Sequence, residues 1–372
     1  MRRLRRGAPI SELRFELPFY RQRVNVHQQP PAHTPTCHDG RESLLNSPEM
    51  TTHSTTRHRV SHADFEAQLA RIEALPGDRR AGFFGPDSIS WRINRESAVF
   101  LGAGRAALLQ LAHPWVATSL LHHSNLLHDA IGRFHSTFRV IYTMLFGTRA
   151  QALAAARQLY KRHSGITGEL PSSTGAHTRG EHYEANEITA LRWVYATLVE
   201  SAVLAYEFVL PPLLPAEREQ YYAEGKHMAA LFGMPPQSLP ANWSEFLRYC
   251  TEMFESPLLG VDDNARSLGR SVMSGVGTWV RPPRWYRSLT SHWMPPRFRP
   301  CFELEPVDEA AIRRLRRNLR HLYPRIPSAI RFVGPYYEAH ARLRGRALGP
   351  LTRQSNRFWM GQPHLLFPQS SD

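Results

Sequence analysis

The stretch Gly132–His163, GRFHSTFRVIYTMLFGTRAQALAAARQLYKRH, decides the expected fold and the candidate site. Two helical segments meet at Gly147–Thr148, where the glycine interrupts the first helix and the threonine suits the N-cap of the second. Arg133 and Thr137 are four residues apart, so their side chains share one face of the first helix. The apolar stripe of the second helix ends in its last turn at His163. The stretch therefore predicts a helix pair that brings an arginine, a threonine and a histidine together.

Helical periodicity recurs along most of the chain, and no stretch shows the alternation of a half-buried strand. The long apolar run Trp193–Leu214 contains Glu200 and Glu207, which favours a buried helix over a membrane span. A loop is expected from 166 to 180, and a Pro-rich connection from 257 to 300. The fold class is therefore predicted to be all-α. Helices are expected at 61–75, 94–111, 114–128, 131–146, 149–163, 185–210, 215–231, 243–256, 308–321 and 326–343.

The chain of 372 residues is expected to form one large domain with flanking segments. Residues 1–60 are rich in His, Pro, Thr and Arg without periodicity, which predicts a disordered basic arm. Residues 61–346 are expected to form the all-α domain, and 347–372 an irregular tail. Met50 is an alternative start to Met1. The basic N-terminus lacks an apolar h-region, and the cysteines show no CxxC spacing, so a reduced, cytoplasmic location is expected.

The chain is strongly basic, with a formal net charge of +14. Such a balance suits nucleic acid or an anionic membrane as a partner. Because only two of the 46 basic residues are lysines, we attribute the excess to a genome-wide arginine preference and expect no nucleic acid. The segment 265–300 interleaves arginines with aromatic residues, which is typical of peripheral contact with an anionic membrane. The alternative is a connection that packs its aromatic side chains and exposes its arginines.

Four residues are candidates for the site. His163 carries a neutral imidazole that could ligate haem iron; the alternative is a core histidine with satisfied hydrogen bonds. Arg133 and Thr137 could bind a haem propionate or orient oxygen; the alternative is a salt-bridged arginine and a threonine bonded to its own helix. Arg105 lies among small apolar residues, where a charge is costly unless it is paired. It would meet an acidic group, meet a propionate, or extend outward.

A non-haem iron site is a weaker interpretation. A di-iron centre would use two Glu-x-x-His repeats on facing helices, and the chain contains one, Glu224 to His227. A solvated helix face is the simpler interpretation of this pair. Other histidines gather in the same region as the candidate site, namely His113, His122, His123 and His135.

Four motifs in order resemble the superfamily of the rubber oxygenases (latex-clearing proteins) and the endoplasmic-reticulum-bound fungal oxygenases. They are LGAGRAALLQLAHPWVATSLLHHS (101–124), GRFHSTFRVIYTMLFG (132–147), RQLYKRHSGITG (157–168) and YEANEITALRWVYATLVESAVLAYE (183–207). YPRIPSAIRFVGPYYEAHARLRG (323–345) also looks like the closing helix of that superfamily. The resemblance covers about residues 80 to 345, and most bacterial members of the superfamily are uncharacterised.

The resemblance implies a single globin-like, multi-helix domain that encloses a b-type haem and cleaves a carbon–carbon double bond with dioxygen. His163 matches the proximal iron ligand, and Arg133 and Thr137 match an Arg and a Thr four residues apart. Two positions depart from the pattern: Ser136 stands where the rubber-cleaving branch has Lys, and Tyr195 where many relatives have His. These departures, with the lack of an export signal, argue against polyisoprene as the substrate.

We therefore expect a haem b-dependent oxygenase that acts with dioxygen on a small, apolar, unsaturated substrate. His163 is expected to hold the iron, with Arg133 and Arg105 also binding the cofactor and with Arg133 and Thr137 in the catalytic role. The apolar faces of the 94–111 and 185–210 helices are expected to line the substrate cavity. The alternatives are a non-catalytic haem or small-ligand binding protein, and a peripheral membrane or interaction protein that has lost the cofactor.

Overall fold

The helix pair predicted for residues 132–163 forms, with the predicted corner at Gly147–Thr148. α5 (Ala130–Phe146) ends at Gly147, and α6 (Arg149–Ser164) begins directly after Thr148. The Thr148 hydroxyl accepts the Gln151 N–H at 3.1 Å, and the Gln151 side chain accepts the Thr148 N–H at 2.9 Å. This reciprocal pair is a capping box, which satisfies two N–H groups that the start of a helix leaves without partners. The corner thereby fixes where α6 starts and how it turns back along α5.

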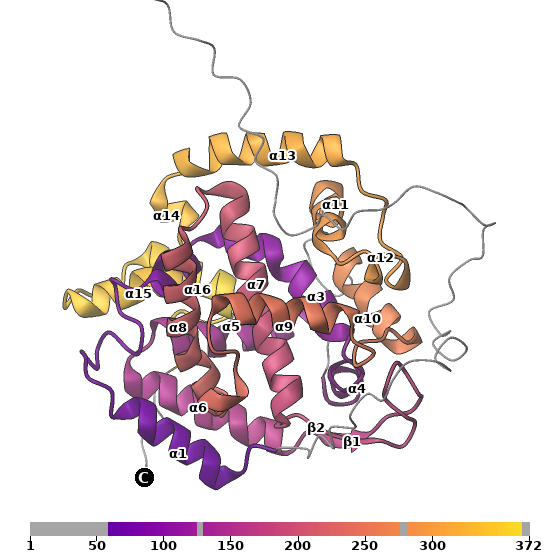
Figure 1. Ribbon diagram of the computed structural model, residues 1–372. Coiled ribbons are helices and arrows are strands. Elements are labelled where there is room, and N and C mark those ends of the chain that lie inside the picture. Colours follow the sequence, from indigo (N-terminus) through magenta and orange to yellow (C-terminus); the bar gives the residue numbers. More distant parts are fainter. Residues whose placement is uncertain (1–58, 125–128, 276–280, 367–372) are drawn as a thin grey trace, which may run out of the picture. The chain divides into compact units, whose positions relative to one another are not determined.

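In the computed structural model, residues 59–124, 129–275 and 281–366 are described, and all of them belong to a compact unit of residues 37–372. Helices dominate this unit (Figure 1), so the all-α prediction is confirmed, while the globin-like arrangement stays a prediction. The predicted arm 1–60 lies outside the described residues except for its last two positions.

Helices follow one another along most of the described chain, with one pair of short strands between α6 and α7. The first are α1 (His62–Glu73), α2 (Ile89–Asn94), the 3-10 helix η1 (Ser97–Gly102), α3 (Ala103–Leu111), α4 (Pro114–His123), α5 and α6. Next come β1 (Thr167–Glu169), β2 (His182–Glu184), α7 (Ile188–Val209), α8 (Pro215–Leu231), η2 (Pro236–Ser238) and α9 (Trp243–Glu255). The last are α10 (Asp263–Ser274), α11 (Arg284–Trp293), α12 (Phe298–Cys301), α13 (Glu309–Leu322), η3 (Tyr323–Arg325), α14 (Ser328–Arg331), α15 (Gly334–Leu343) and α16 (Pro350–Met360).

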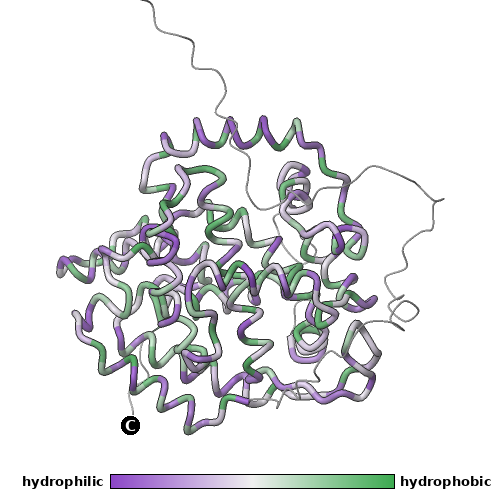
Figure 2. Tube along the Cα trace, viewed as in Figure 1, coloured by the Kyte–Doolittle hydropathy of each residue, from purple (hydrophilic) through white to green (hydrophobic). Residues whose placement is uncertain are grey.

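α7 runs through the core of the unit (Figure 1) and is coloured mainly as hydrophobic along its length (Figure 2). It is long and apolar enough to cross a membrane, by length and composition only, and 61% of its most apolar 18-residue window is buried inside the unit. The Trp193 indole donates to the Leu109 carbonyl at 2.8 Å and so ties α7 to α3. α7 is therefore the buried helix that the sequence predicts.

Small residues let neighbouring elements approach one another at η1 and α3. A Cβ at Gly102 would lie 2.5 Å from the Ser201 carbonyl oxygen of α7, and one at Gly104 would lie 2.8 Å from the Thr290 hydroxyl of α11. The Gly104 N–H also donates to the Tyr286 hydroxyl at 2.9 Å. The glycines here serve the close packing of helices.

Two segments near the site differ from the sequence prediction. The predicted helix 94–111 is split, because Glu96 turns inward: its carboxylate accepts the Tyr323 hydroxyl at 3.0 Å and pairs with Arg331 at 3.1 Å. The predicted loop 166–180 begins as β1, which pairs antiparallel with β2 in the register Thr167↔Glu184, Gly168↔Tyr183, Glu169↔His182. Strands of three residues are too short to show an alternating pattern in a sequence.

The C-terminal third also contains more helix than predicted. The connection 257–300 holds α10, α11 and α12, and the tail 347–372, predicted to be irregular, contains α16. Local end signals explain α10 and α16: the Asp262 carboxylate caps the first at the Ala265 N–H, and Gly361 ends the second with φ of 70°. A left-handed residue at a helix C-terminus favours glycine.

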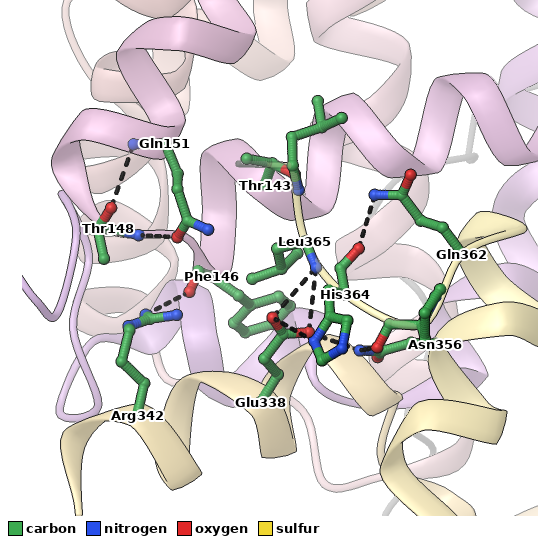
Figure 3. Close-up of polar contacts among 12 residues, drawn as sticks. Thr143, Phe146, Thr148, Gln151, Glu338, Arg342, Asn356, Gln362, His364 and Leu365 are labelled. Atoms are coloured by element: carbon green, nitrogen blue, oxygen red, sulfur yellow. Dashed lines mark hydrogen bonds and ion pairs between the residues drawn. The ribbon is translucent and has the colours of Figure 1, made fainter. Parts of the chain in front are cut away.

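The C-terminal helices α15 and α16 pack against α5 (Figure 3). Glu338 of α15 accepts the Leu365 N–H with both carboxylate oxygens at 3.1 Å, and the Leu366 N–H donates to the Thr143 hydroxyl of α5 at 3.2 Å. Arg342 donates to the Phe146 carbonyl at 2.6 Å, at the end of α5. These contacts fix the C-terminal half of α5, so its position does not depend on the corner with α6 alone.

Candidate functional site

His163 lies half-buried in the last turn of α6. Burial, together with the positive charges of Arg133 and Arg162, lowers the pKa of His163 to about 4. The Asn186 side chain hydrogen-bonds His163 and acts in the opposite direction. Asn186 is itself held in place, because its amide donates to the Ser164 hydroxyl at 3.1 Å. His163 is therefore neutral at pH 7, with its ring oriented by an amide from the start of α7.

Arg133 stands on α5 within electrostatic reach of His163. Its guanidinium makes no hydrogen bond or ion pair with any residue in the described ranges 59–124, 129–275 and 281–366, and it is half-buried. Burial and the charge of Arg162 lower the pKa of Arg133. A half-buried cation beside a second cation is unfavourable unless an anion joins it. The site therefore has the electrostatics of an anion-binding position next to a neutral imidazole.

Thr137 and Ser136 occupy the same turns of α5 and are both half-buried. The Thr137 hydroxyl donates to the Arg133 carbonyl at 3.0 Å, so it uses its single proton within its own helix. The Ser136 hydroxyl accepts a hydrogen bond from the Arg162 guanidinium at 3.0 Å. This bond joins the C-terminal end of α6 to α5. In this arrangement Thr137 offers an acceptor, and Arg133 offers the donors.

Arg105 is placed elsewhere. It is 3% exposed, and three of its N–H groups donate at 2.9 Å to the Trp293 carbonyl, the Ser201 hydroxyl and the Glu200 carboxylate. Of the three environments considered from the sequence, the structure shows the acidic partner. Glu200 lies 14 residues beyond Asn186, about 20 Å at the rise of a helix. Arg105 is thus not brought together with His163 and Arg133, and its assignment to the cofactor stays a prediction.

An apolar cavity of about 70 Å³ lies between α2, α5, α7 and α8. Ile141 and Leu145 line it from α5, and they continue the steps of four residues that start at Arg133 and Thr137. The sequence predicts a cavity lined by the 94–111 and 185–210 segments. In the structure, α7 lines the cavity from the 185–210 segment, whereas the 94–111 segment contributes only Asn94, which lies on α2. Its other lining residues are Phe84, Ser90, Tyr195, Leu198, Val199, Tyr221, Gly225, Met228 and Phe232.

Tyr195 brings a hydroxyl to this cavity. The residue is 3% exposed, and its Oη has no hydrogen-bond partner among the residues that the structure describes. Burial raises the pKa of Tyr195 well above its usual range, so the group is a neutral phenol. A buried hydroxyl without a partner costs about 1–3 kcal/mol, so Tyr195 marks the polar end of an apolar space.

The remaining sequence candidates have local roles. The Glu224 carboxylate accepts the Ile89 and Ser90 N–H groups at the start of α2, at 3.2 and 2.8 Å. Within the described part of the chain, no group of three or more His, Cys, Asp or Glu side chains is arranged to hold a metal ion. In the segment 265–300, Leu289 is buried while Trp285 is 46% exposed. Membrane contact through this segment stays a prediction.

Sequence reasoning missed Asn186 and Arg162 as parts of the site. Arg162 precedes His163 directly, but the importance of its charge appears only when α6 folds back on α5. Asn186 belongs to a segment more than twenty residues away, and β1–β2 pairing returns the chain to the end of α6. No local pattern marks such a residue, because its role comes from the fold.

One comparison with known proteins gives a match. The family model described as "ER-bound oxygenase mpaB/B'/Rubber oxygenase, catalytic domain" matches residues 91–323, which is more than half of the chain. This range contains α5, α6 and α7, and hence His163, Arg133 and all the residues lining the cavity except Phe84 and Ser90. Neither the search of curated proteins nor the search of solved structures gives a significant match.

Proposed function

The chain belongs to the family of the ER-bound oxygenase mpaB/B'/rubber oxygenase catalytic domain, and on that premise we propose that it is an oxygenase in which His163 holds a haem b. The observation that carries the proposal is the half-buried Arg133 guanidinium, which lacks a protein partner in the described chain and lies beside a neutral histidine. A haem needs an imidazole with a free lone pair for its iron and cations for its propionates. The residues present fit both needs.

Each residue has a separate part in the proposal. His163 ligates the iron while its other ring nitrogen is held by the Asn186 side chain, since ligating histidines are oriented by such partners. Arg133 donates to a propionate. Thr137 keeps an acceptor toward the pocket, where it orients a water molecule or a protonated group, because its own proton is used by the Arg133 carbonyl. The haem, when bound, supplies the iron chemistry that activates dioxygen.

The cavity between α5 and α7 supports an apolar substrate. Its volume of about 70 Å³ is well below the roughly 150 Å³ of a cavity that takes up benzene, so it suits dioxygen or the end of an apolar chain. Tyr195 provides one hydroxyl there, which favours a substrate end that carries a single polar atom. We propose small, apolar, unsaturated molecules as the substrate class, in a cytoplasmic or peripheral membrane setting.

The test uses haem and its dimethyl ester, which lacks the propionate charges. The wild-type chain is expected to bind haem about 10-fold to 100-fold more tightly than the ester, the effect of one charge-assisted hydrogen bond. Arg133→Gln is expected to lose most of this preference, whereas the control Arg162→Gln, whose guanidinium is already bonded to Ser136, is expected to keep it. Equal preference in wild type and Arg133→Gln would contradict the propionate assignment.

Oxygen uptake separates the catalytic proposal from a non-catalytic haem protein. Reduced wild-type protein is expected to consume dioxygen faster when a short terpenoid alkene is added, and His163→Ala is expected to show no such response. Haem binding without any alkene-dependent uptake across the series would favour the binding protein instead.

A further inference from the structure

A second group of histidines lies outside the proposed haem site. His113 stands at the corner between α3 and α4, as the N-cap residue of α4, and is 4% exposed. His177 lies in the segment that joins β1 to β2 and is 7% exposed. Their ring centres are 5.4 Å apart with an angle of 47° between the planes. Two buried imidazoles from distant parts of the chain are thus neighbours.

The polar atoms of this group are incompletely satisfied. His113 Nδ1, His177 Nε2 and the Thr174 hydroxyl are all buried and have no hydrogen-bond partner within residues 59–124, 129–275 and 281–366. Thr174 belongs to the same turn as His177, because its N–H donates to the His177 carbonyl at 3.0 Å and its carbonyl accepts the His177 N–H at 3.1 Å. Buried polar groups in native proteins find partners, so two such atoms on neighbouring rings and a third on the turn that carries His177 indicate a bound water or ion.

The chemistry of the two rings favours an ion. His177 Nδ1 lies 3.1 Å from a Glu181 carboxylate oxygen, which places the ring proton on Nδ1 and leaves a lone pair on Nε2. A carboxylate behind an imidazole is the usual partner of a metal-bound histidine. His113 Nδ1 is buried and without a protein partner in the described chain as well, so each ring presents a nitrogen to which an ion can bind.

The distance between the ring centres of His113 and His177 agrees with one metal ion bound by both rings. An ion about 2 Å from a nitrogen of each ring, at a tetrahedral angle, would hold the ring centres about 5 Å apart. The observed separation is 5.4 Å. Imidazole ligands suit Zn²⁺, Cu²⁺, Ni²⁺ and Co²⁺, whereas Mg²⁺ and Ca²⁺ prefer oxygen.

We propose that His113 and His177 form a transition-metal site, completed by the Thr174 hydroxyl and water. The site has two histidine ligands, so it does not conflict with the finding that no group of three or more His, Cys, Asp or Glu side chains in the described chain could hold a metal ion. It joins the β1–β2 segment to the α3–α4 corner. His113 is separated from His123, at the other end of α4, by about 15 Å, and His123 contacts the Thr167 carbonyl near the end of α6. The metal site is therefore distinct from the proposed haem site.

Zinc binding by the full-length protein tests the proposal, because zinc is counted apart from haem iron. After incubation with Zn²⁺ and dialysis, the wild-type protein is expected to retain one more zinc per chain than His113→Ala or His177→Ala. Zinc is also expected to raise the melting temperature of the wild-type protein and not that of the two variants. His182→Ala is the control, since His182 is exposed and lies on β2 in the same hairpin.

His177→Gln serves as a second variant of similar size, so that a loss of zinc is not confused with a failure to fold. It is expected to fold, by circular dichroism, and to bind zinc at least tenfold more weakly than His182→Ala. Equal zinc content and equal thermal shifts in wild type, His113→Ala and His177→Gln would overturn the proposal and leave water between the two rings.

Discussion

Replacing Arg105 by methionine separates a structural role of this residue from a role in cofactor binding. Methionine keeps much of the length of the side chain and removes the charge. The change leaves the Glu200 carboxylate, whose side chain is 21% exposed, without the Arg105 guanidinium that pairs with it at 2.9 Å. The Ser201 hydroxyl and the Trp293 carbonyl lose their donors as well.

The magnitude follows from burial. Removing one partner of a buried ion pair costs about 3–5 kcal/mol, because a charge remains in a poorly solvated place. In a chain of this length each kcal/mol lowers the melting temperature by about 2 °C, so a decrease of about 6–10 °C is expected. The matched control is Arg157→Met, which breaks an ion pair with Glu66 whose side chains are 50% and 34% exposed. Exposed pairs contribute about 0–1 kcal/mol, so the control should change little.

The assay combines urea unfolding with haem content per folded chain. Arg105→Met is expected to lose stability and to bind haem normally at a temperature where it is folded. The double variant Arg105→Met/Glu200→Leu is expected to recover part of the loss, since it leaves no isolated charge. A stability loss below about 1 kcal/mol together with a clear loss of haem would refute this reasoning and place Arg105 at the cofactor.

Three further predictions concern single groups. Arg133→Gln is expected to raise the pKa of His163 above about 4, because one of the positive charges that lower it is gone; NMR titration of the cofactor-free protein measures this, and an unchanged pKa would contradict the proximity of the two residues. Tyr195→Phe is expected to raise stability by about 1 kcal/mol, since it removes a buried hydroxyl without a partner; a loss in urea unfolding would instead reveal a bound partner. Burial raises the pKa of Glu338, so its contribution to stability is present below pH 4.5 and is lost as the pH rises through the raised value. Glu338→Gln should therefore lower the unfolding free energy at pH 4 relative to that at pH 7, and an unchanged pH profile of the unfolding free energy would show that the Glu338 carboxyl makes no such contribution.

The α5–α6 pair shows why part of this fold was predictable. Gly147 and Thr148 carry a local signal, and the structure contains the expected corner with Thr148 as N-cap, to which Gln151 adds the second half of a capping box. The same holds for α7, whose apolar length indicates burial whatever its neighbours are. Such elements depend on residues within one or two turns, and a sequence contains that information directly.

The parts that were missed depend on distant contacts. The interruption at Glu96 follows from its contacts with Tyr323 and Arg331, more than 200 residues later. The hydrogen bond from Asn186 to His163 requires the β1–β2 pairing, and the partner of Arg105 requires α3 to lie on α7. The sequence left three environments open for Arg105 because spacing within one helix does not identify the group that faces it.

The most direct test of the central claim is the absorption spectrum of freshly purified full-length protein, with iron measured in parallel, for wild type and His163→Ala. Since His163 is neutral at pH 7 and the Arg133 guanidinium has no partner in the described chain, the wild-type protein is expected to show an intense Soret band and about one iron per chain. His163→Ala is expected to lose both, while the exposed control His182→Ala retains them. A colourless, iron-free wild-type protein that takes up no added haem, or a His163→Ala protein with full haem content, would contradict the account.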